Sequence, residues 1–267
     1  MRQTITVAFA LGLAWVLAQG APARAQAGQA HSLADAKPGD VRVFCSTAFH
    51  FSPELLAQVE KAIGKTVVVE YGGVRTALKE KMLKGQEFEV AISLPDANEE
   101  LFKAGKILAD TYDIGLDPIA FAVRGAVPKP DVSTPEAAKA TLLKAASVKW
   151  TPQGFARDTA RKVLSTIGIA DAIKDSSTRR EEVALGPGEY EIVMGPISEI
   201  LTNTKVTNLG VVVASLQAEA QMQAVIGRHA NDERAARALI AFLQSPAIDP
   251  ALKANGIIKH VANGTLK

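Results

Sequence analysis

Short apolar runs alternate with stretches of helical spacing along residues 41–104 of this chain. Apolar runs rich in β-branched residues are typical of strands buried on both faces of a parallel sheet, and they predict strands at 41–46, 66–71 and 88–94. Between these runs, cap residues such as Ser52-Pro53 and stop residues such as Gly64 mark the ends of helices. The expected helices are 53–63, 74–84 and 96–104. This alternation predicts an α/β unit with a mainly parallel sheet.

A proline-rich segment, AVPKPDVSTPEAA, follows an expected strand at 117–125 and predicts a crossing into a second α/β unit. That unit is expected to hold helices at 135–146 and 155–167 and strands at 147–150, 190–194 and 206–214. A strand at 221–227 carries the chain back, and Asp232 caps a helix after it. We therefore predict two lobes joined by a two-strand hinge, with helices flanking each sheet. Lobe 1 is formed by 41–120 and 221–267, and lobe 2 by 121–220.

The first 25 residues have the pattern of a signal peptide. Arg2 gives a short basic start, ITVAFALGLAWVLA is apolar, and Ala23-Arg24-Ala25 fits small-x-small cleavage. The apolar stretch is shorter than the roughly 20 residues of a membrane-spanning helix. We therefore expect export to the periplasm, with residues 26–40 forming a flexible leader.

Charge and cysteine content narrow the classes of partner. The chain has 30 basic and 28 acidic residues, and loss of Arg2 and Arg24 with the signal peptide leaves 28 of each. This balance favours neither a nucleic-acid footprint nor a polybasic membrane patch. Cys45 is the single cysteine and the four histidines are scattered, so neither a disulfide framework nor a metal site is expected. A small-molecule partner is favoured, and no cofactor is expected.

Six segments together resemble a known family. VRVFCSTAF, VVVEYGG, FEVAISLPD, TPQGFARDTARKVLSTIGI, EIVMGPIS and ARALIAFLQSPAIDPALKANGI are similar, in order and approximate spacing, to the periplasmic molybdate-binding proteins of ABC transporters. The resemblance covers nearly all of residues 41–258. It implies a type II periplasmic binding protein fold, a non-enzymatic transport function, an ABC permease as partner and an anionic solute as ligand. We also expect a monomer.

In that family, the resemblance implies an anion held between the lobes by hydroxyl side chains, by backbone N–H groups at helix starts and by a tyrosine. Unpaired N–H groups at a helix start can bind an oxyanion without a countercharge. In this sequence the first serine position holds Ala48, the second falls on Val74 or Arg75, and the tyrosine position holds Met194. All three departures remove hydroxyl donors, so the sequence favours a ligand other than molybdate.

The turn at Gly72-Gly73 favours an organic carboxylate. Glycines let the backbone approach a ligand closely, and Arg75 adds a planar, charged fork suited to a carboxylate. Phe49 and Met194 would contact the apolar part of such a ligand. The alternative is that Arg75 points to solvent or pairs with Glu70 or Glu80.

The predicted function is therefore capture of a small anion, with an organic carboxylate favoured over molybdate, tungstate or another tetrahedral oxyanion. Delivery to a sensor rather than a permease stays open. The rival class is a secreted enzyme that uses Cys45 or Ser46 with His50. In the second lobe, Gln153 and Gly154 precede a helix, and Thr178 with Arg179 begins a further ligand loop. The candidate contacts are Ser46, Thr47, Ala48, Phe49, Gly73, Val74, Arg75, Gln153, Gly154, Thr178 and Met194.

Overall fold

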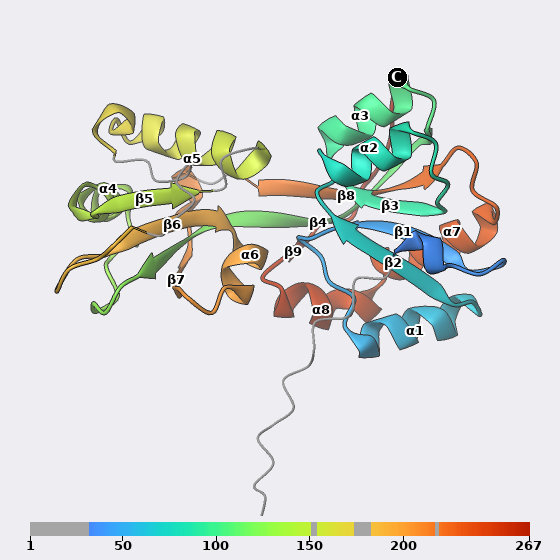
Figure 1. Cartoon of the computed structure of the whole chain (residues 1–267), viewed down its shortest axis with the longest axis horizontal. Helices are drawn as coiled ribbons and strands as arrows, with labels where there is room; N and C mark the ends of the chain where they lie inside the picture. The colour runs from blue at the N-terminus through green and yellow to red at the C-terminus, as the bar shows by residue number, and fades with distance from the viewer. Residues whose placement is uncertain (1–31, 151–153, 174–182, 217–218) are drawn as a thin grey trace, which may run out of the picture.

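Two groups of strands and helices are joined by two long strands in the computed structural model (Figure 1). The structure describes residues 32–150, 154–173, 183–216 and 219–267. The joining strands, β4 (Ile107–Arg124) and β8 (Glu219–Gly227), pair antiparallel. Hydrogen-bonded neighbours follow the order β2-β1-β3-β8-β4-β6-β5. The predicted two-lobed α/β fold is confirmed.

The first lobe is a sheet covered by helices on both faces. β1 (Val41–Ser46) pairs in parallel with β2 (Val67–Gly72) and with β3 (Val90–Ser93). Because side chains alternate across a strand, Val43 packs in the core formed with α1 and α7, whereas Phe44 packs in the core formed with α2 and α3. The helices of this lobe are α1 (Pro53–Ile63), α2 (Ala77–Leu83), α3 (Pro95–Lys103), α7 (Glu233–Gln244) and α8 (Asp249–Ala254).

The second lobe has a mixed sheet with its own core. β5 (Ser147–Trp150) runs parallel to β6 (Glu191–Pro196), while β6 and β7 (Thr207–Val211) run antiparallel to the end of β4. Phe121 and Ile192 are fully buried in the core of this lobe. Its helices are α4 (Pro135–Lys144), α5 (Gly154–Thr166) and α6 (Ile197–Thr202).

β4 changes partners where it passes from one lobe to the other. Its residues up to Pro118 pair with β8, and its residues from Ile119 onward pair with β6 and β7. β4 is continuous through this region, so the backbone hydrogen bonds of one lobe extend into the other along this strand. The lobe boundaries at 120 and 220 stay a prediction, and β4 runs past residue 120 without a break.

Three parts of the structure differ from the elements predicted from the sequence. β4 begins at Ile107 rather than at residue 117, because buried polar residues such as Thr111 and Asp113 interrupt its apolar pattern. α6 was not predicted, and its six residues are too few for a helical periodicity to be visible. α2 begins at Ala77, so Arg75 lies in the turn before the helix and not inside it.

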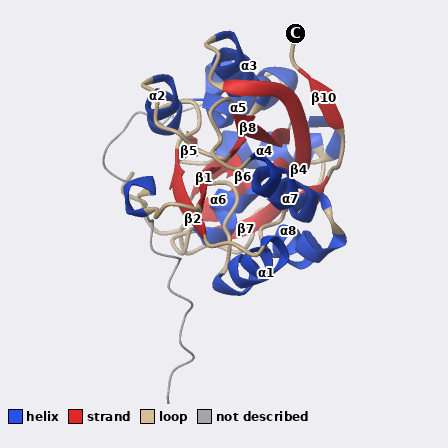
Figure 2. Cartoon of the chain, turned by 90° about the vertical axis from the view of Figure 1, so that its right-hand side faces the viewer, coloured by secondary structure: helices blue, strands red, loops and turns tan. Residues whose placement is uncertain are grey.

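Two short strands near the C-terminus were also unpredicted. β9 (Ile258–Lys259) and β10 (Asn263–Thr265) pair with β4, and Figure 2 shows β10 along the edge of the molecule. The 3-10 helices are Leu33–Asp35, Ala170–Ala172, Ala214–Leu216 and Pro246–Ile248.

The N-terminal region is only partly as predicted. The predicted signal peptide at 1–25 lies outside the described residues. Within the predicted leader, Leu33 is buried in the first lobe and its N–H donates to Oε2 of Glu70 at 2.9 Å. The described part of the leader is therefore docked rather than flexible. In the described part of the chain, no helix has the length and hydrophobicity to cross a membrane.

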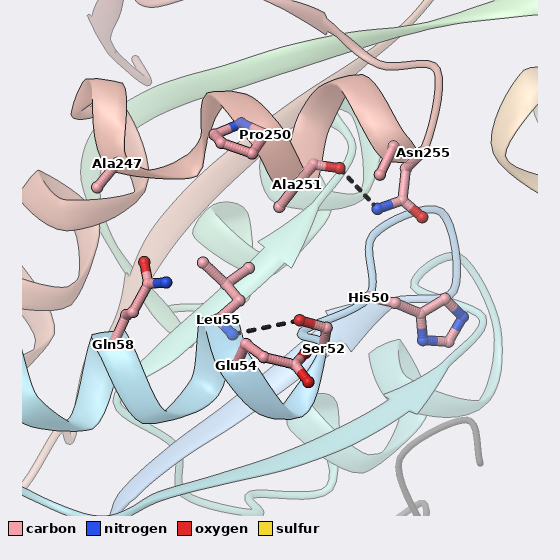
Figure 3. A pocket seen from close by; sticks show the side chains of 10 residues that line it. His50, Ser52, Glu54, Leu55, Gln58, Ala247, Pro250, Ala251 and Asn255 are labelled. Atoms are coloured by element: carbon pink, nitrogen blue, oxygen red, sulfur yellow. Dashed lines mark hydrogen bonds between the residues drawn. The ribbon is translucent and has the colours of Figure 1, made fainter. Parts of the chain in front are cut away.

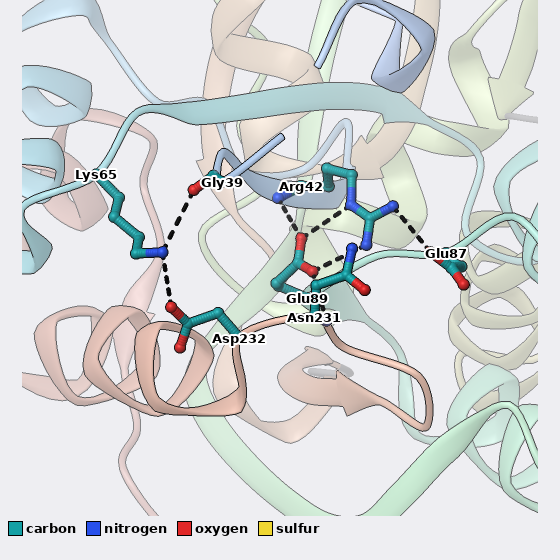
Figure 4. Close-up of polar contacts among 7 residues, drawn as sticks. All are labelled: Gly39, Arg42, Lys65, Glu87, Glu89, Asn231 and Asp232. Carbon is teal, nitrogen blue, oxygen red and sulfur yellow. Dashed lines mark hydrogen bonds and ion pairs between the residues drawn. The ribbon is translucent and has the colours of Figure 1, made fainter. Parts of the chain in front are cut away.

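A buried carboxylate ties together the start of β1, the start of β3 and the turn before α7. Glu89 accepts hydrogen bonds from Arg42 through its backbone N–H (2.7 Å), Nε (3.0 Å) and Nη2 (2.9 Å), and from the N–H of Asn231 (3.0 Å) (Figure 4). Its side chain is 1% exposed, whereas that of Glu87, on the same arginine, is 51% exposed. Burial makes the Glu89 pair costly to break.

We expect Glu89→Ala to lower the free energy of unfolding by about 3–5 kcal/mol, because it leaves the guanidinium of Arg42 without its buried partner. The matched control Glu87→Ala removes an exposed partner of Arg42 and should cost less than about 1 kcal/mol. Urea denaturation of the three proteins measures both values. Equal losses in the two variants would contradict this account.

Candidate functional site

A cleft of about 440 Å³ lies where the two lobes meet. Its first wall is built from the loops that follow β1, β2 and β3, at the carboxyl ends of three parallel strands, where open α/β sheets bind ligands. Its second wall is built from the starts of α5 and α6, and its floor from the joining strands. The lining residues are Ser46, Thr47, Ala48, Gly72, Gly73, Val74, Arg75, Thr76, Leu94, Asp117, Ala156, Pro196, Glu199 and Ala220.

Most of the candidate contacts that the sequence places in the first lobe meet in this cleft. They come from two loops that are far apart in the chain and adjacent in the sheet, because β1 and β2 are neighbours. The Oγ of Ser46 accepts a hydrogen bond from the N–H of Ala48 at 3.3 Å, and Thr47 is exposed. The candidates that line the cleft are Ser46, Thr47, Ala48, Gly73, Val74 and Arg75.

Other candidates lie elsewhere. Phe49 is buried in the core of the first lobe and Met194 in the core of the second, so neither is among the residues that line the cleft. The expected contact of these two side chains with an organic ligand would require them to leave this apolar packing. Gln153, Thr178 and Arg179 lie outside the described residues. Gly154 begins α5, whose third residue, Ala156, lines the cleft.

The turn after β2 is closed by its own backbone. The N–H groups of Thr76 and Leu78 both donate to the carbonyl of Gly73, each at 3.1 Å. A Cβ on Gly72 would lie 2.9 Å from Cγ of Leu78, so a side chain there would force that leucine to shift. Glycine therefore lets β2 end directly against α2 and brings Arg75 to the wall of the cleft.

Arg75 has a partner that the sequence did not suggest. Its Nε lies 2.7 Å from Oδ2 of Asp96 in the first turn of α3, although the angle is unsuited to a hydrogen bond. Glu70 pairs instead with Lys81, and Glu80 lies beside Lys84. The carboxylate of Asp96 is more than half exposed, so the ion pair is accessible to competition from a ligand carboxylate.

Two acidic residues of the cleft, Asp117 and Glu199, were not predicted from the sequence. Asp117, on β4, is fully buried; its Oδ2 accepts from Oγ of Ser198 at 2.6 Å and its Oδ1 from the N–H of Ser198 at 3.3 Å. The pKa of the Asp117 carboxyl is raised to about 7, mainly by burial. The hydrogen bonds from Ser198 lower this pKa, whereas the negative charge of Glu199 raises it. The one sequence signal for Asp117 was its position: an aspartate directly before Pro118, inside an otherwise apolar strand.

The cysteine and histidine of the rival enzyme hypothesis do not form a catalytic pair. Cys45 is fully buried, its Sγ donates to the carbonyl of Phe49 at 3.3 Å, and burial strongly raises the pKa of its thiol. His50 stacks on Tyr71, and burial lowers the pKa of its imidazole. His50 faces a separate groove between α1 and α8 (Figure 3), so it is not placed to activate Ser46 in the cleft.

The part of the chain that the structure describes contains no group of three or more histidine, cysteine, aspartate and glutamate side chains that could hold a metal ion. The described lining of the cleft supplies one arginine, two carboxyl groups, a few hydroxyl groups and backbone N–H groups, set among small apolar side chains.

Comparison with solved structures gives similar two-lobed proteins. The substrate-binding domain of a molybdenum ABC transporter protein from Clostridium difficile superposes with a TM-score of 0.61 at 13% identity, covering 83% of this chain and 99% of that one. The tungstate-binding protein of Desulfovibrio alaskensis gives a TM-score of 0.59 at 14% identity, covering 85% and 99%. At these identities the likeness concerns the fold, and it confirms the resemblance to molybdate-binding proteins at that level.

Comparison with sequences gives one relative that is named as an enzyme, and it also gives a family. An aconitate isomerase from a Pseudomonas species is 23% identical over 213 residues, which cover 76% of this chain and 81% of that protein. The family model for bacterial extracellular solute-binding proteins matches residues 41–258. Since that match spans both lobes and both joining strands, this chain belongs to the bacterial extracellular solute-binding proteins.

Proposed function

We propose that the protein captures a small organic carboxylate in the cleft between its lobes and delivers it to an ABC permease of the inner membrane. The observation that carries this proposal is Arg75, the basic residue on the described wall of the cleft, held there by a turn that requires glycine. A planar guanidinium matches the two oxygens of a carboxylate. A tetrahedral oxyanion held by neutral donors has no need of it.

The rest of the cleft suits the organic part of such a ligand. Side chains from both lobes and from the floor present small apolar surfaces: Ala48, Val74, Leu94, Ala156 and Ala220. Apolar walls with a few polar groups are typical of sites for small organic molecules. A carboxylate held by Arg75 would therefore have its carbon atoms against these side chains.

Transport by closure follows from the division of the contacts between lobes. The loops after β1 and β2 belong to one lobe and the starts of α5 and α6 to the other. A ligand stabilises a closed form only if it interacts better with that form than with the open one. Contacts from both walls supply that difference, and the joining strands β4 and β8 supply the hinge.

A second candidate function is proton transfer on a bound tricarboxylate, favoured by the acidic groups of the cleft. Isomerisation of aconitate, the reaction named for the Pseudomonas relative, can proceed by removal of a proton from the methylene carbon and its return at the other end of the allylic anion, with no net oxidation. Glu199 lines the cleft and is exposed. A carboxylate so placed can take and return a proton.

For the carboxylate proposal, we expect Arg75→Ala to weaken binding roughly 10- to 100-fold. The reason is that a hydrogen bond to a charged group contributes about 1.5–3 kcal/mol. Asp96→Asn should strengthen binding, because it frees the guanidinium. Lys79→Ala is the matched control, since Lys79 also pairs with an acid of α3, Glu100, but does not line the cleft. Thermal shift with succinate, tricarballylate, aconitate, molybdate, tungstate and sulfate selects the ligand, and calorimetry measures its affinity.

A response confined to molybdate and tungstate would refute the carboxylate proposal and support the oxyanion alternative. A carboxylate response that is unchanged in Arg75→Ala would show that the arginine does not hold the ligand. Loss of affinity in Lys79→Ala as large as in Arg75→Ala would point to a general effect on the packing of α2 against α3.

The second candidate function predicts that cis-aconitate in deuterated buffer is converted to the trans isomer with deuterium on carbon. Proton NMR follows both events. Glu199→Gln should abolish conversion while binding persists, because an amide cannot accept the proton. A spectrum that stays unchanged in the presence of the wild-type protein would refute isomerisation and leave transport as the proposed function of the cleft.

A further inference from the structure

Asp117 occupies a distinctive position between the cleft and the hinge. It lies on β4 directly before the strand leaves β8 and joins β6, and it contributes to the floor of the cleft. Its side chain has no exposed surface in this structure. Any change in its charge therefore alters the electrostatic interaction with a ligand in the cleft, and it also affects the strand about which the lobes move.

Asp117 also holds the second wall of the cleft in place. The residue before α6 is Pro196, whose side chain cannot cap the helix. The carboxylate of Asp117 replaces that cap from a neighbouring strand, accepting from both Oγ and N–H of Ser198. Because Pro196 and Glu199 line the cleft on either side of Ser198, the position of this wall depends on the Asp117 carboxyl.

The charges around Asp117 disfavour its ionised form. α6 contributes Glu199, whose negative charge adds to the effect of burial, and the resulting pKa is about 7. On β8 the strand partner of Asp117 is Ala220, and the next residue along, Glu219, is also acidic. Across the cleft, Arg75 is already paired with Asp96. None of these neighbours supplies an unshared positive charge.

We propose that the protein takes up a proton when it captures its ligand, and that Asp117 is the group that receives it. This inference rests on the proposed function, in which the ligand is an anion. A bound anion places a further negative charge beside the floor of the cleft, and closure removes water that would screen it. Both effects favour the neutral form of a nearby carboxyl group.

Proton uptake makes affinity depend on pH in a defined direction. Where the free protein has Asp117 ionised, above about pH 7, each added pH unit weakens binding by up to about tenfold, because one proton must be bound with the ligand. Where Asp117 is already protonated in the free protein, this dependence disappears. The ligand must itself be fully ionised throughout the range, as succinate and sulfate are.

The test is calorimetric titration of succinate and of sulfate between about pH 7 and pH 9, each in two buffers of different ionisation enthalpy. The wild-type protein should take up as much as about one proton per ligand. Asp117→Asn should take up none, because the amide is neutral and can keep both hydrogen bonds to Ser198. Asp113→Asn is the matched control: Asp113 is another buried aspartate of β4, it accepts from Gln221 and Gln223, and it does not line the cleft.

Two further variants move the pH window in opposite directions. Ser198→Ala removes the hydrogen bond from Oγ, which favours the ionised carboxylate, and keeps the one from the backbone N–H, so the pH at which affinity begins to fall should rise. Glu199→Gln removes a nearby negative charge, so that pH should decrease. These shifts distinguish a proton on Asp117 from a proton on any other group of the cleft.

The free protein provides a measurement that needs no ligand. A carboxyl whose pKa is raised in the folded state, from 3.8 to about 7, binds more protons folded than unfolded between those values. The contribution of Asp117 to the free energy of unfolding should therefore fall as the pH rises from about 4 to about 7, so the stability of wild type relative to Asp117→Asn should decrease over this range. A wild-type stability profile that Asp117→Asn leaves unchanged would overturn the proposal.

The outcomes separate the two proposals. Binding of either anion without proton uptake, or with the same uptake in Asp117→Asn, overturns the role of Asp117 and leaves anion capture intact. Absence of binding by both anions and by every member of the thermal-shift panel overturns the proposed function, and the proton linkage with it. Proton uptake that is lost in Asp117→Asn and kept in Asp113→Asn supports both.

Discussion

The sharing of β4 and β8 between the lobes is the constraint on which the rest of this structure depends. Because β4 is hydrogen-bonded to β8 on one side of the crossing and to β6 and β7 on the other, the two walls of the cleft are connected by a continuous, paired strand. The loops after β1, β2 and β3 can therefore face the starts of α5 and α6 with little freedom other than bending at the crossing. A ligand needs only to stabilise that one motion.

Two pairs of polar groups stand at the wall and the floor of the cleft. Arg75 is balanced by Asp96, and Asp117 by the hydroxyl and N–H groups of Ser198. In each pair one member belongs to a helix start and the other to a loop or strand outside that helix. Such pairs give each charged group in the walls a partner, which avoids the cost of an unpaired charge.

The cleft also differs from a site designed only for a dehydrated tetrahedral anion. At the positions where the resemblance to molybdate-binding proteins implies hydroxyl groups, the chain has Ala48, either Val74 or Arg75, and Met194, and the last of these is buried in the core of the second lobe. Positive charge enters through Arg75 instead, and negative charge through Asp117 and Glu199. A site with charges of both signs can discriminate between anions by their protonation and shape as well as by their charge.

The sequence by itself determined the lobes, the order of most strands and helices, and the two loops that bear Ser46 and Arg75. These features are local: β-branched runs, caps and glycine stops act over a few residues, so they can be recognised without knowledge of the neighbours. The Gly72-Gly73 turn is of this kind, since two glycines after a β-branched run predict a turn, whereas its close approach to Leu78 of α2 appears only in the structure.

Only the tertiary structure decided which of those residues meet and what charge surrounds them. Asp96 reaches Arg75 from the next helix along, and Asp117 meets Ser198 across 81 positions of the chain. Phe49 and Met194 lie in the cores, where they pack with side chains from other elements, and the face that a strand residue such as Met194 presents depends on register, which one sequence does not specify. The pKa of Asp117 depends on burial by several elements at once, and burial is a property that the folded chain creates.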